Sequence, residues 1–166
     1  MAAGNVVVRF EEVSFGYSTE SPILDEASFS VREDTKLTVM GQNGAGKSTI
    51  FKLITGELKP DKGSIHFAQG ATIATAKQVM AREHLTETVR DYFAHAFTEV
   101  PYNLDKKIAD VLEVVNLTAT LDKPVGDFSG GQQARLLLAF ALIAEPDIFL
   151  LDEPTNNLDR DGIDHL

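Results

Sequence analysis

Residues 41–48 read Gly-Gln-Asn-Gly-Ala-Gly-Lys-Ser and match the pattern G-x-x-x-x-G-K-[ST]. A strand is expected before the pattern, at 36–40, and a helix is expected after Gly46. The glycines let successive backbone N–H groups turn inward around phosphate oxygens, toward which the helix directs its positive end. Lys47 would supply a point charge to the β and γ phosphates, and Ser48 would hold Mg²⁺. A glycine-rich turn with a solvated lysine is the alternative. The flanking strand and helix favour a phosphate-binding loop in an α/β fold.

Length and composition are those of a globular protein. The 166 residues suggest one domain, or a domain and a fraction, with 43% hydrophobic and 24% charged residues. No apolar run reaches the roughly 18 residues that a bilayer-spanning helix needs, and the N-terminus does not resemble a signal peptide. Because there are no cysteines, disulfides, thiol nucleophiles and thiolate metal sites are excluded. We expect a soluble, cytoplasmic protein.

The charge balance argues against a nucleic-acid-binding surface. The chain has 15 Lys and Arg residues against 25 Asp and Glu residues, a net charge of −10 at pH 7. Nucleic acid is a polyanion, so a protein that wraps it needs the opposite sign. We expect no direct DNA binding, and contact with other nucleic acid would need a local basic patch or a partner.

The pattern of apolar residues predicts a strand-rich first half and a more helical second half. Expected strands, separated by glycines, cover 6–10, 27–31, 36–40, 64–67 and 72–75. Helical spacing then appears at Val89, Phe93 and Phe97, and again at Ile108, Val111, Leu112 and Val115. A further helix is expected at about 132–144, and a strand buried on both faces at 148–151.

Two carboxylates follow the last expected strand. Asp152 and Glu153 come directly after four apolar residues, Ile148 to Leu151. Ligands of open α/β sheets bind at this carboxyl end of the strands. Asp152 could hold Mg²⁺, directly or through a water molecule, and Glu153 could orient the water that attacks the γ phosphate. The alternative is a loop with two solvated acids.

A second glycine turn precedes the helix expected at 132–144. Its residues, Ser129, Gly130, Gly131 and Gln132, would expose backbone N–H groups at a helix N-terminus. Taken alone, this pattern fits either an ordinary N-cap serine or a second anion-binding site.

Three motifs follow one another along the chain: the phosphate loop, the Ser-Gly-Gly-Gln turn, and Leu-Leu-Asp-Glu-Pro with the following Thr-Asn-Asn-Leu-Asp. In this order they resemble the nucleotide-binding domain of the ATP-binding cassette (ABC) family over nearly the whole chain. The resemblance implies a P-loop ABC-type ATPase core with a small β subdomain and a helical insertion. It also implies ATP and Mg²⁺ as cofactors, and hydrolysis by two domains arranged head to tail with ATP between them.

The resemblance implies a role for each residue that matches a family motif. Tyr17 matches the aromatic residue that stacks on adenine, and Gln78 the glutamine that senses Mg²⁺ and the γ phosphate. The implied phosphate-binding residues of the loop are Asn43, Gly44, Ala45, Gly46, Lys47, Ser48 and Thr49. The signature turn, which acts on the ATP of the partner domain, is matched by Ser129, Gly130, Gly131 and Gln132. The implied catalytic residues are Glu153 and Lys47, the implied metal ligands are Ser48, Gln78 and Asp152, and the implied D-loop residue is Asp159.

The same resemblance divides the chain into 1–78 (β subdomain and phosphate-loop part of the core), 79–129 (helical subdomain) and 130–166 (signature helix, acidic strand end and D-loop). The family's switch histidine has no match, because His165 follows Glu153 too closely. We therefore expect a domain that is incomplete at its C-terminus and that alone hydrolyses ATP weakly or not at all. None of His66, His84, His95 and His165 shows metal-ligand spacing.

Residues 153–159, Glu-Pro-Thr-Asn-Asn-Leu-Asp, look more like the ABC-F branch than like transporters, in which a serine and a small residue commonly precede Leu-Asp. ABC-F proteins are soluble tandem-domain ATPases that act on the ribosome. Three functions remain open. The chain could belong to an ABC-F translation factor, with a second ABC domain and the ribosome as partners. It could be the ATPase subunit that docks on transmembrane transporter subunits, or a nucleotide-binding domain without catalytic activity.

Overall fold

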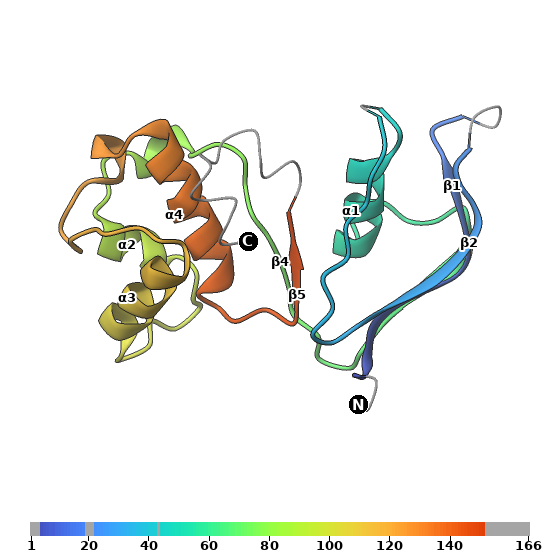
Figure 1. Ribbon diagram of the computed structural model, residues 1–166, viewed down its shortest axis with the longest axis horizontal. Helices are drawn as coiled ribbons and strands as arrows, with labels where there is room; N and C mark the ends of the chain where they lie inside the picture. Colours follow the sequence, from blue (N-terminus) through green and yellow to red (C-terminus); the bar gives the residue numbers. More distant parts are fainter. Residues whose placement is uncertain (1–3, 19–21, 43, 152–166) are drawn as a thin grey trace. The chain divides into compact units, whose positions relative to one another are not determined.

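A computed structural model describes residues 4–18, 22–42 and 44–151 (Figure 1). Contacts within the chain divide it into two compact units, Met1–Ile73 and Ala74–Leu166, each of which is described by itself. Five residues named above lie outside the described residues: Asn43, Asp152, Glu153, Asp159 and His165.

The first unit contains a three-stranded antiparallel sheet in the order β2-β1-β3. The strands are β1 (Val6–Gly16), β2 (Pro22–Arg32) and β3 (Lys62–Phe67), so each of the three expected strands extends further than its apolar pattern. Along β1, Val8, Phe10 and Val13 are almost fully buried, and the register with β2 shifts between Phe10 and Val13. The Phe10 ring stacks on Phe29 of β2 with 4.3 Å between ring centroids, a cross-strand pair that stabilises the sheet.

The strand expected at 36–40 is absent, so this prediction was wrong. The structure has no strand at 35–42, although this segment leads directly into the phosphate loop. Leu37 is 59% exposed and Met40 is 88% exposed. A strand needs a neighbour with which to form ladder hydrogen bonds, and within the described ranges no strand pairs with this segment. Apolar, β-branched composition alone therefore did not make it a strand.

The helix expected after Gly46 is present as α1 (Lys47–Thr55). Gly46 is its N-cap, and Gly56 ends it in the left-handed conformation, with its N–H donating to the Leu53 carbonyl. Leu53 and Ile54 bury their side chains, and Lys52 in the last turn is favourable for the negative end of the helix. α1 is thus a short helix with a glycine C-cap and with no side chain capping its N-terminus.

The second unit is mainly helical. Its helices are α2 (Val89–Ala94), α3 (Leu104–Val114) and α4 (Gly130–Leu142), and α3 contacts both others. Two 3₁₀ turns accompany them, η1 (Arg82–His84) and η2 (Val125–Asp127). Two short strands, β4 (Ile73–Thr75) and β5 (Ile148–Leu150), form a two-stranded sheet.

The helical spacing of the sequence marks the core of this unit. Of the seven positions with that spacing, Phe97 is half-buried and the rest are buried: Val89, Phe93, Ile108, Val111, Leu112 and Val115. Leu136 of α4 and Val125 of η2 complete the fully buried centre. Within the described residues, no helix has both the length and the apolar composition that crossing a membrane requires.

Candidate functional site

The N-terminus of α1 is prepared for an anion. No side chain caps it, and no acidic residue lies in its first turn. The N–H groups of Thr49 and Ile50 both donate to the Gly46 carbonyl at 3.1 Å, which fixes the first turn. Because the positive end of the helix meets no acidic side chain in this turn, it is free to stabilise a bound phosphate.

Two glycines of the loop have left-handed backbone conformations, for different reasons. At Gly46, with φ of +90°, a Cβ atom would lie 2.1 Å from Cγ2 of Ile23 on β2. At Gly44, with φ of +84°, a Cβ would meet nothing within 4 Å. The protein's own packing therefore requires glycine at 46, whereas at 44 only the backbone conformation does. The open space at Gly44 leaves the backbone accessible to a ligand.

Lys47 reaches back across the loop. Its ammonium group donates to the carbonyl oxygens of Gly41 at 2.9 Å and of Gln42 at 3.0 Å. Gly41, Gln42, Gly44, Ala45 and Ser48 are exposed, so a ligand can approach the loop from solvent. The charge is thus held at the loop by two weak partners, which phosphate oxygens can replace with stronger charge-assisted bonds.

Tyr17 lies close to the phosphate loop within the first unit. Its hydroxyl is 3.4 Å from Oγ1 of Thr49, a buried residue of α1. Its ring meets Phe15 edge to face, with 5.3 Å between centroids, and the residue is 66% exposed. The exposed aromatic ring thus lies beside the phosphate loop, and its contact with adenine stays a prediction.

The serine of the second glycine turn is an N-cap. Ser129 accepts from the backbone N–H of Gln132 at 3.4 Å, and the Gln132 side chain accepts from the Ser129 N–H at 3.0 Å. This reciprocal capping box begins α4 two residues before the expected start at 132. The N-cap interpretation is confirmed, and it leaves the backbone of the following two residues available.

Among the described residues, nothing sterically requires glycine at Gly130 or Gly131. A Cβ at either position would meet nothing within 4 Å, and both have ordinary helical φ values. Glycine in a helix costs about 1 kcal/mol relative to alanine. The absence of side chains here therefore favours close approach by a group from outside the described chain.

Arg135, which was not predicted from the sequence, ties the middle of α4 to the residues just after α3. It is only 9% exposed and donates to the Asn116 carbonyl at 2.6 Å. Asn116 follows the end of α3 and has a φ of +51°. An arginine within an otherwise Ala- and Leu-rich stretch was the available sequence signal. The side chain ties α4, which begins with the signature turn, to the chain after α3.

Gln78, the predicted sensor of Mg²⁺, is exposed in a bend after β4. It belongs to the second unit, whereas Tyr17 and the phosphate loop belong to the first. The expected strand at 148–151 is present as β5, with Ile148 and Leu150 buried, and Leu151 is the last residue described before the acidic pair. The roles of Gln78, Asp152 and Glu153 stay predictions.

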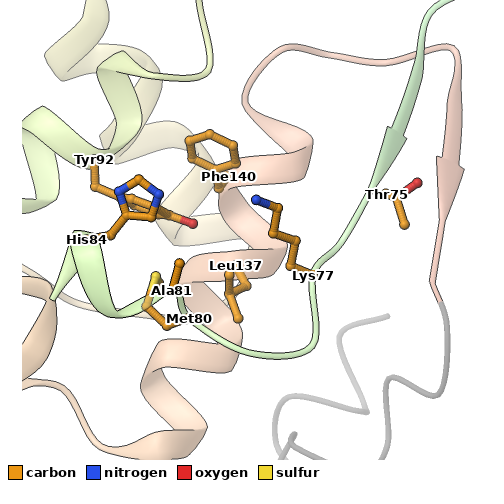
Figure 2. A pocket seen from close by; sticks show the side chains of 8 residues that line it. All are labelled: Thr75, Lys77, Met80, Ala81, His84, Tyr92, Leu137 and Phe140. Atoms are coloured by element: carbon orange, nitrogen blue, oxygen red, sulfur yellow. The ribbon is translucent and has the colours of Figure 1, made fainter.

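A small cavity in the second unit is unsuited to a nucleotide. Figure 2 shows it between α4 and the segment that contains Lys77 and His84. Its volume of about 60 Å³ is far below the roughly 300 Å³ of a small-molecule pocket.

Burial and the nearby Glu87 carboxylate raise the pKa of Tyr92, which lines the cavity, so its hydroxyl stays protonated.

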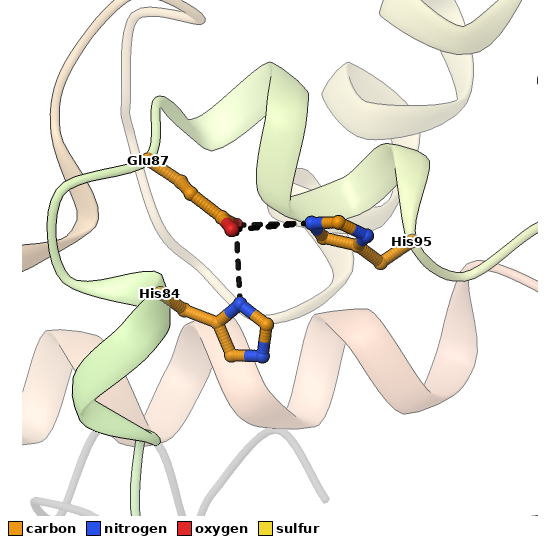
Figure 3. A group of neighbouring side chains, drawn as sticks. All are labelled: His84, Glu87 and His95. Carbon is orange, nitrogen blue, oxygen red and sulfur yellow. Dashed lines mark hydrogen bonds and ion pairs between the residues drawn. The ribbon is translucent and has the colours of Figure 1, made fainter.

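Two histidines lie together, although the histidines show no metal-ligand spacing in the sequence. His84 and His95 both face Glu87 (Figure 3) and are separated by ten residues of chain. Sequence spacing does not reveal this pair, because the fold brings the end of η1 and the end of α2 to the same carboxylate.

Comparison with known proteins gives a family. Residues 24–156 match the family model described as "ABC transporter". An ABC transporter ATP-binding protein of Clostridium tetani is 34% identical over 97% of this chain and 39% of its own length. The ABC transporter F family member 3 of Arabidopsis thaliana is 31% identical over 98% of this chain and 23% of its own length. The chain thus spans well under half the length of these curated relatives.

A solved structure gives the same result for the fold. cbiO1 of Clostridium perfringens, part of the ABC transporter complex cbiONQ, superposes with a TM-score of 0.80 at 26% identity. The superposition covers 96% of this chain and 70% of the cbiO1 chain. The P-loop α/β fold class predicted from the three motifs is confirmed.

Proposed function

This chain belongs to the ABC family of ATP-binding domains, and from that premise we propose that it binds Mg-ATP at residues 43–49 and hydrolyses it as one half of a head-to-tail pair of domains. The observation that carries the proposal is the loop itself: two left-handed glycines, an anion-ready helix N-terminus and the Lys47 ammonium group all meet there. In this proposal Tyr17 stacks on adenine, and Lys47 contacts the β and γ phosphates.

The proposed metal ligands suit Mg²⁺. Ser48 offers a hydroxyl oxygen, Gln78 an amide oxygen and Asp152 a carboxylate, and hard oxygen ligands of this kind are what Mg²⁺ prefers. When bound, the ion neutralises charge that develops on the phosphate oxygens. Glu153 orients the attacking water and takes up its proton, and Lys47 stabilises the charge of the phosphate being transferred.

The signature turn supports the pairing of two domains. In the pair that we propose, the N-terminus of α4 from one domain faces the γ phosphate held by the loop of the other. Gly130 and Gly131 would let the phosphate approach the helix backbone closely, which accounts for glycines in open space. Ser129 and Gln132 fix the turn through the capping box, so the donors are already in place before ATP binds.

Gly131→Asp is expected to separate folding from catalysis. A carboxylate in the first turn of α4 favours the helix by about 0.3–1 kcal/mol, so the free energy of unfolding should be unchanged or slightly higher. In the paired protein the same charge would repel the γ phosphate, and ATP turnover should fall by at least about tenfold. Denaturant unfolding and a phosphate-release assay measure the two effects.

Gly131→Ala is the matched control, because it adds a Cβ at the same place without charge. We expect it to keep more turnover than Gly131→Asp and to unfold at higher denaturant concentration than the parent. Full turnover in the aspartate variant would rule out the proposed contact across the pair.

We propose that this chain belongs to an ABC-F-type protein and that the ribosome is its partner. Two observations support this: the Thr-Asn-Asn-Leu-Asp sequence at 155–159, and a relative whose name places it in the F family. The similarity to cbiO1, part of a transporter complex, favours the second candidate, a subunit that docks on transmembrane partners. Sedimentation of the full-length protein with purified ribosomes tests the ribosome proposal. Co-sedimentation that depends on ATP supports it. Absence of co-sedimentation with both ATP and a non-hydrolysable analogue contradicts it.

A further inference from the structure

We propose that His84, Glu87 and His95 form a binding site for one Zn²⁺ ion. The site uses no residue of the proposed ATP site, so it stands independently of that proposal. Among the residues that the structure describes, these three offer ligand atoms that all lie within 4.8 Å of one another. Figure 3 shows both imidazole rings directed at the Glu87 carboxylate.

The separations between the histidine nitrogens and the Glu87 carboxylate oxygens suit zinc. Nδ1 of His84 lies 3.1 Å from Oε2 of Glu87, and Nε2 of His95 lies 3.2 Å from both carboxylate oxygens. Bonds of about 2.0–2.1 Å to a tetrahedral Zn²⁺ place neighbouring ligand atoms about 3.3 Å apart. The cluster therefore already has the separations between nitrogen and oxygen that zinc coordination would impose.

The backbone holds the three ligands in place. His84 is the last residue of η1, and its carbonyl accepts from the Glu87 N–H at 3.1 Å. The Glu87 carbonyl accepts from Val125 at 2.9 Å, which ties the loop to η2. His95 ends α2, with its N–H donating to the Tyr92 carbonyl at 3.2 Å. Little ordering is left for the ion to impose, which favours binding.

The surroundings leave one side of the site open. The side chains of His84 and Glu87 are 21% and 27% exposed, whereas that of His95 is 54% exposed. The His84 ring is also fixed by an edge contact with Tyr92, with 5.3 Å between centroids. Three protein ligands and a solvent-facing fourth position, which water can fill, are compatible with zinc coordination.

The donor set selects the class of metal. Imidazole nitrogens suit Zn²⁺ and its transition-metal neighbours, while Mg²⁺ and Ca²⁺ prefer oxygen ligands alone. Without an ion, each ring can donate a hydrogen bond to Glu87. With the ion, the coordinating nitrogen gives up its hydrogen, and the ring carries it on the other nitrogen.

Zinc titration against a chromogenic indicator, without nucleotide and with excess Mg²⁺, tests the site. We expect one Zn²⁺ per chain in the parent, and zinc binding at least about tenfold weaker in His95→Asn and in Glu87→Gln. Loss of a residue that only hydrogen-bonds to a metal ligand already weakens metal affinity by about 10- to 100-fold. His66→Asn is the matched control. His66 lies in the first unit, where Nε2 is 3.3 Å from the Glu11 carboxylate, and among the described residues it belongs to no group of three metal-ligating side chains. This variant should bind zinc as the parent does.

Co²⁺ gives a readout of coordination itself. The parent loaded with Co²⁺ should show the intense visible absorption of a site with low coordination number, and His95→Asn should lose it. His95 is largely exposed, so this variant is expected to fold, which circular dichroism checks. Zinc binding that persists in both ligand variants, that falls equally in His66→Asn, or that is not measurable in the parent would overturn the proposal.

Discussion

Glu153→Gln is expected to lower ATP turnover by at least about 100-fold while leaving ATP binding intact. Glutamine keeps the size and hydrogen bonding of glutamate but removes the carboxylate that orients and deprotonates water, a contribution of about 10²–10⁴ in rate. The paired domains should then stay closed around unhydrolysed ATP. Phosphate release and size-exclusion chromatography of the full-length protein with ATP measure the two consequences.

Glu145→Gln is the matched control for this experiment. It is the same substitution on an exposed residue just before β5, where the carboxylate pairs with Lys107 and has no role in the proposed chemistry. Turnover should be unchanged. If Glu153→Gln hydrolyses ATP at the parental rate, Glu153 is not the catalytic base.

Gly46→Ala is expected to destabilise the protein by about 3 kcal/mol. The left-handed conformation costs a residue with a Cβ about 1–2 kcal/mol, and the overlap with Ile23 at 2.1 Å adds about 1–3 kcal/mol of overpacking. Urea unfolding measures the change. The Gly44→Ala variant has the same kind of backbone conformation with open space around it, so it should lose only about 1–2 kcal/mol. Equal losses in the two variants would contradict a packing role for Gly46.

The sequence predicted local structure best where a local interaction determines it. The Ser-x-x-Gln spacing at 129–132 forms the capping box that begins α4. The glycine before Lys47 similarly sets the start of α1. In each case the residues that decide the structure are neighbours in the chain, so their pattern is readable without the fold.

The predictions failed where residues distant in the sequence determine the local structure or the side-chain contacts. The segment 36–40 has the composition of a strand, but strand formation depends on a pairing neighbour that composition does not reveal. Arg135 is buried where the carbonyl of Asn116, just after α3, accepts its hydrogen bond. His84 lies near His95 because the ends of η1 and α2 both place a histidine against the Glu87 side chain. The loop around Lys47 was predictable as a motif, while the use of Ile23 to enforce its glycine was not.

Calorimetric titration of Mg-ATP into the parent and into Lys47→Ala measures whether the residues around Lys47 bind ATP. Lys47 is the only cationic residue among 41–49, and its ammonium group lies on the loop carbonyls of Gly41 and Gln42. A hydrogen bond to a charged group is worth about 1.5–3 kcal/mol, so the dissociation constant should rise about 10- to 100-fold. Lys52→Ala, an exposed lysine in the last turn of α1, should bind as the parent does. Equal affinity of the parent and Lys47→Ala for Mg-ATP would mean that the loop around Lys47 does not hold the phosphates.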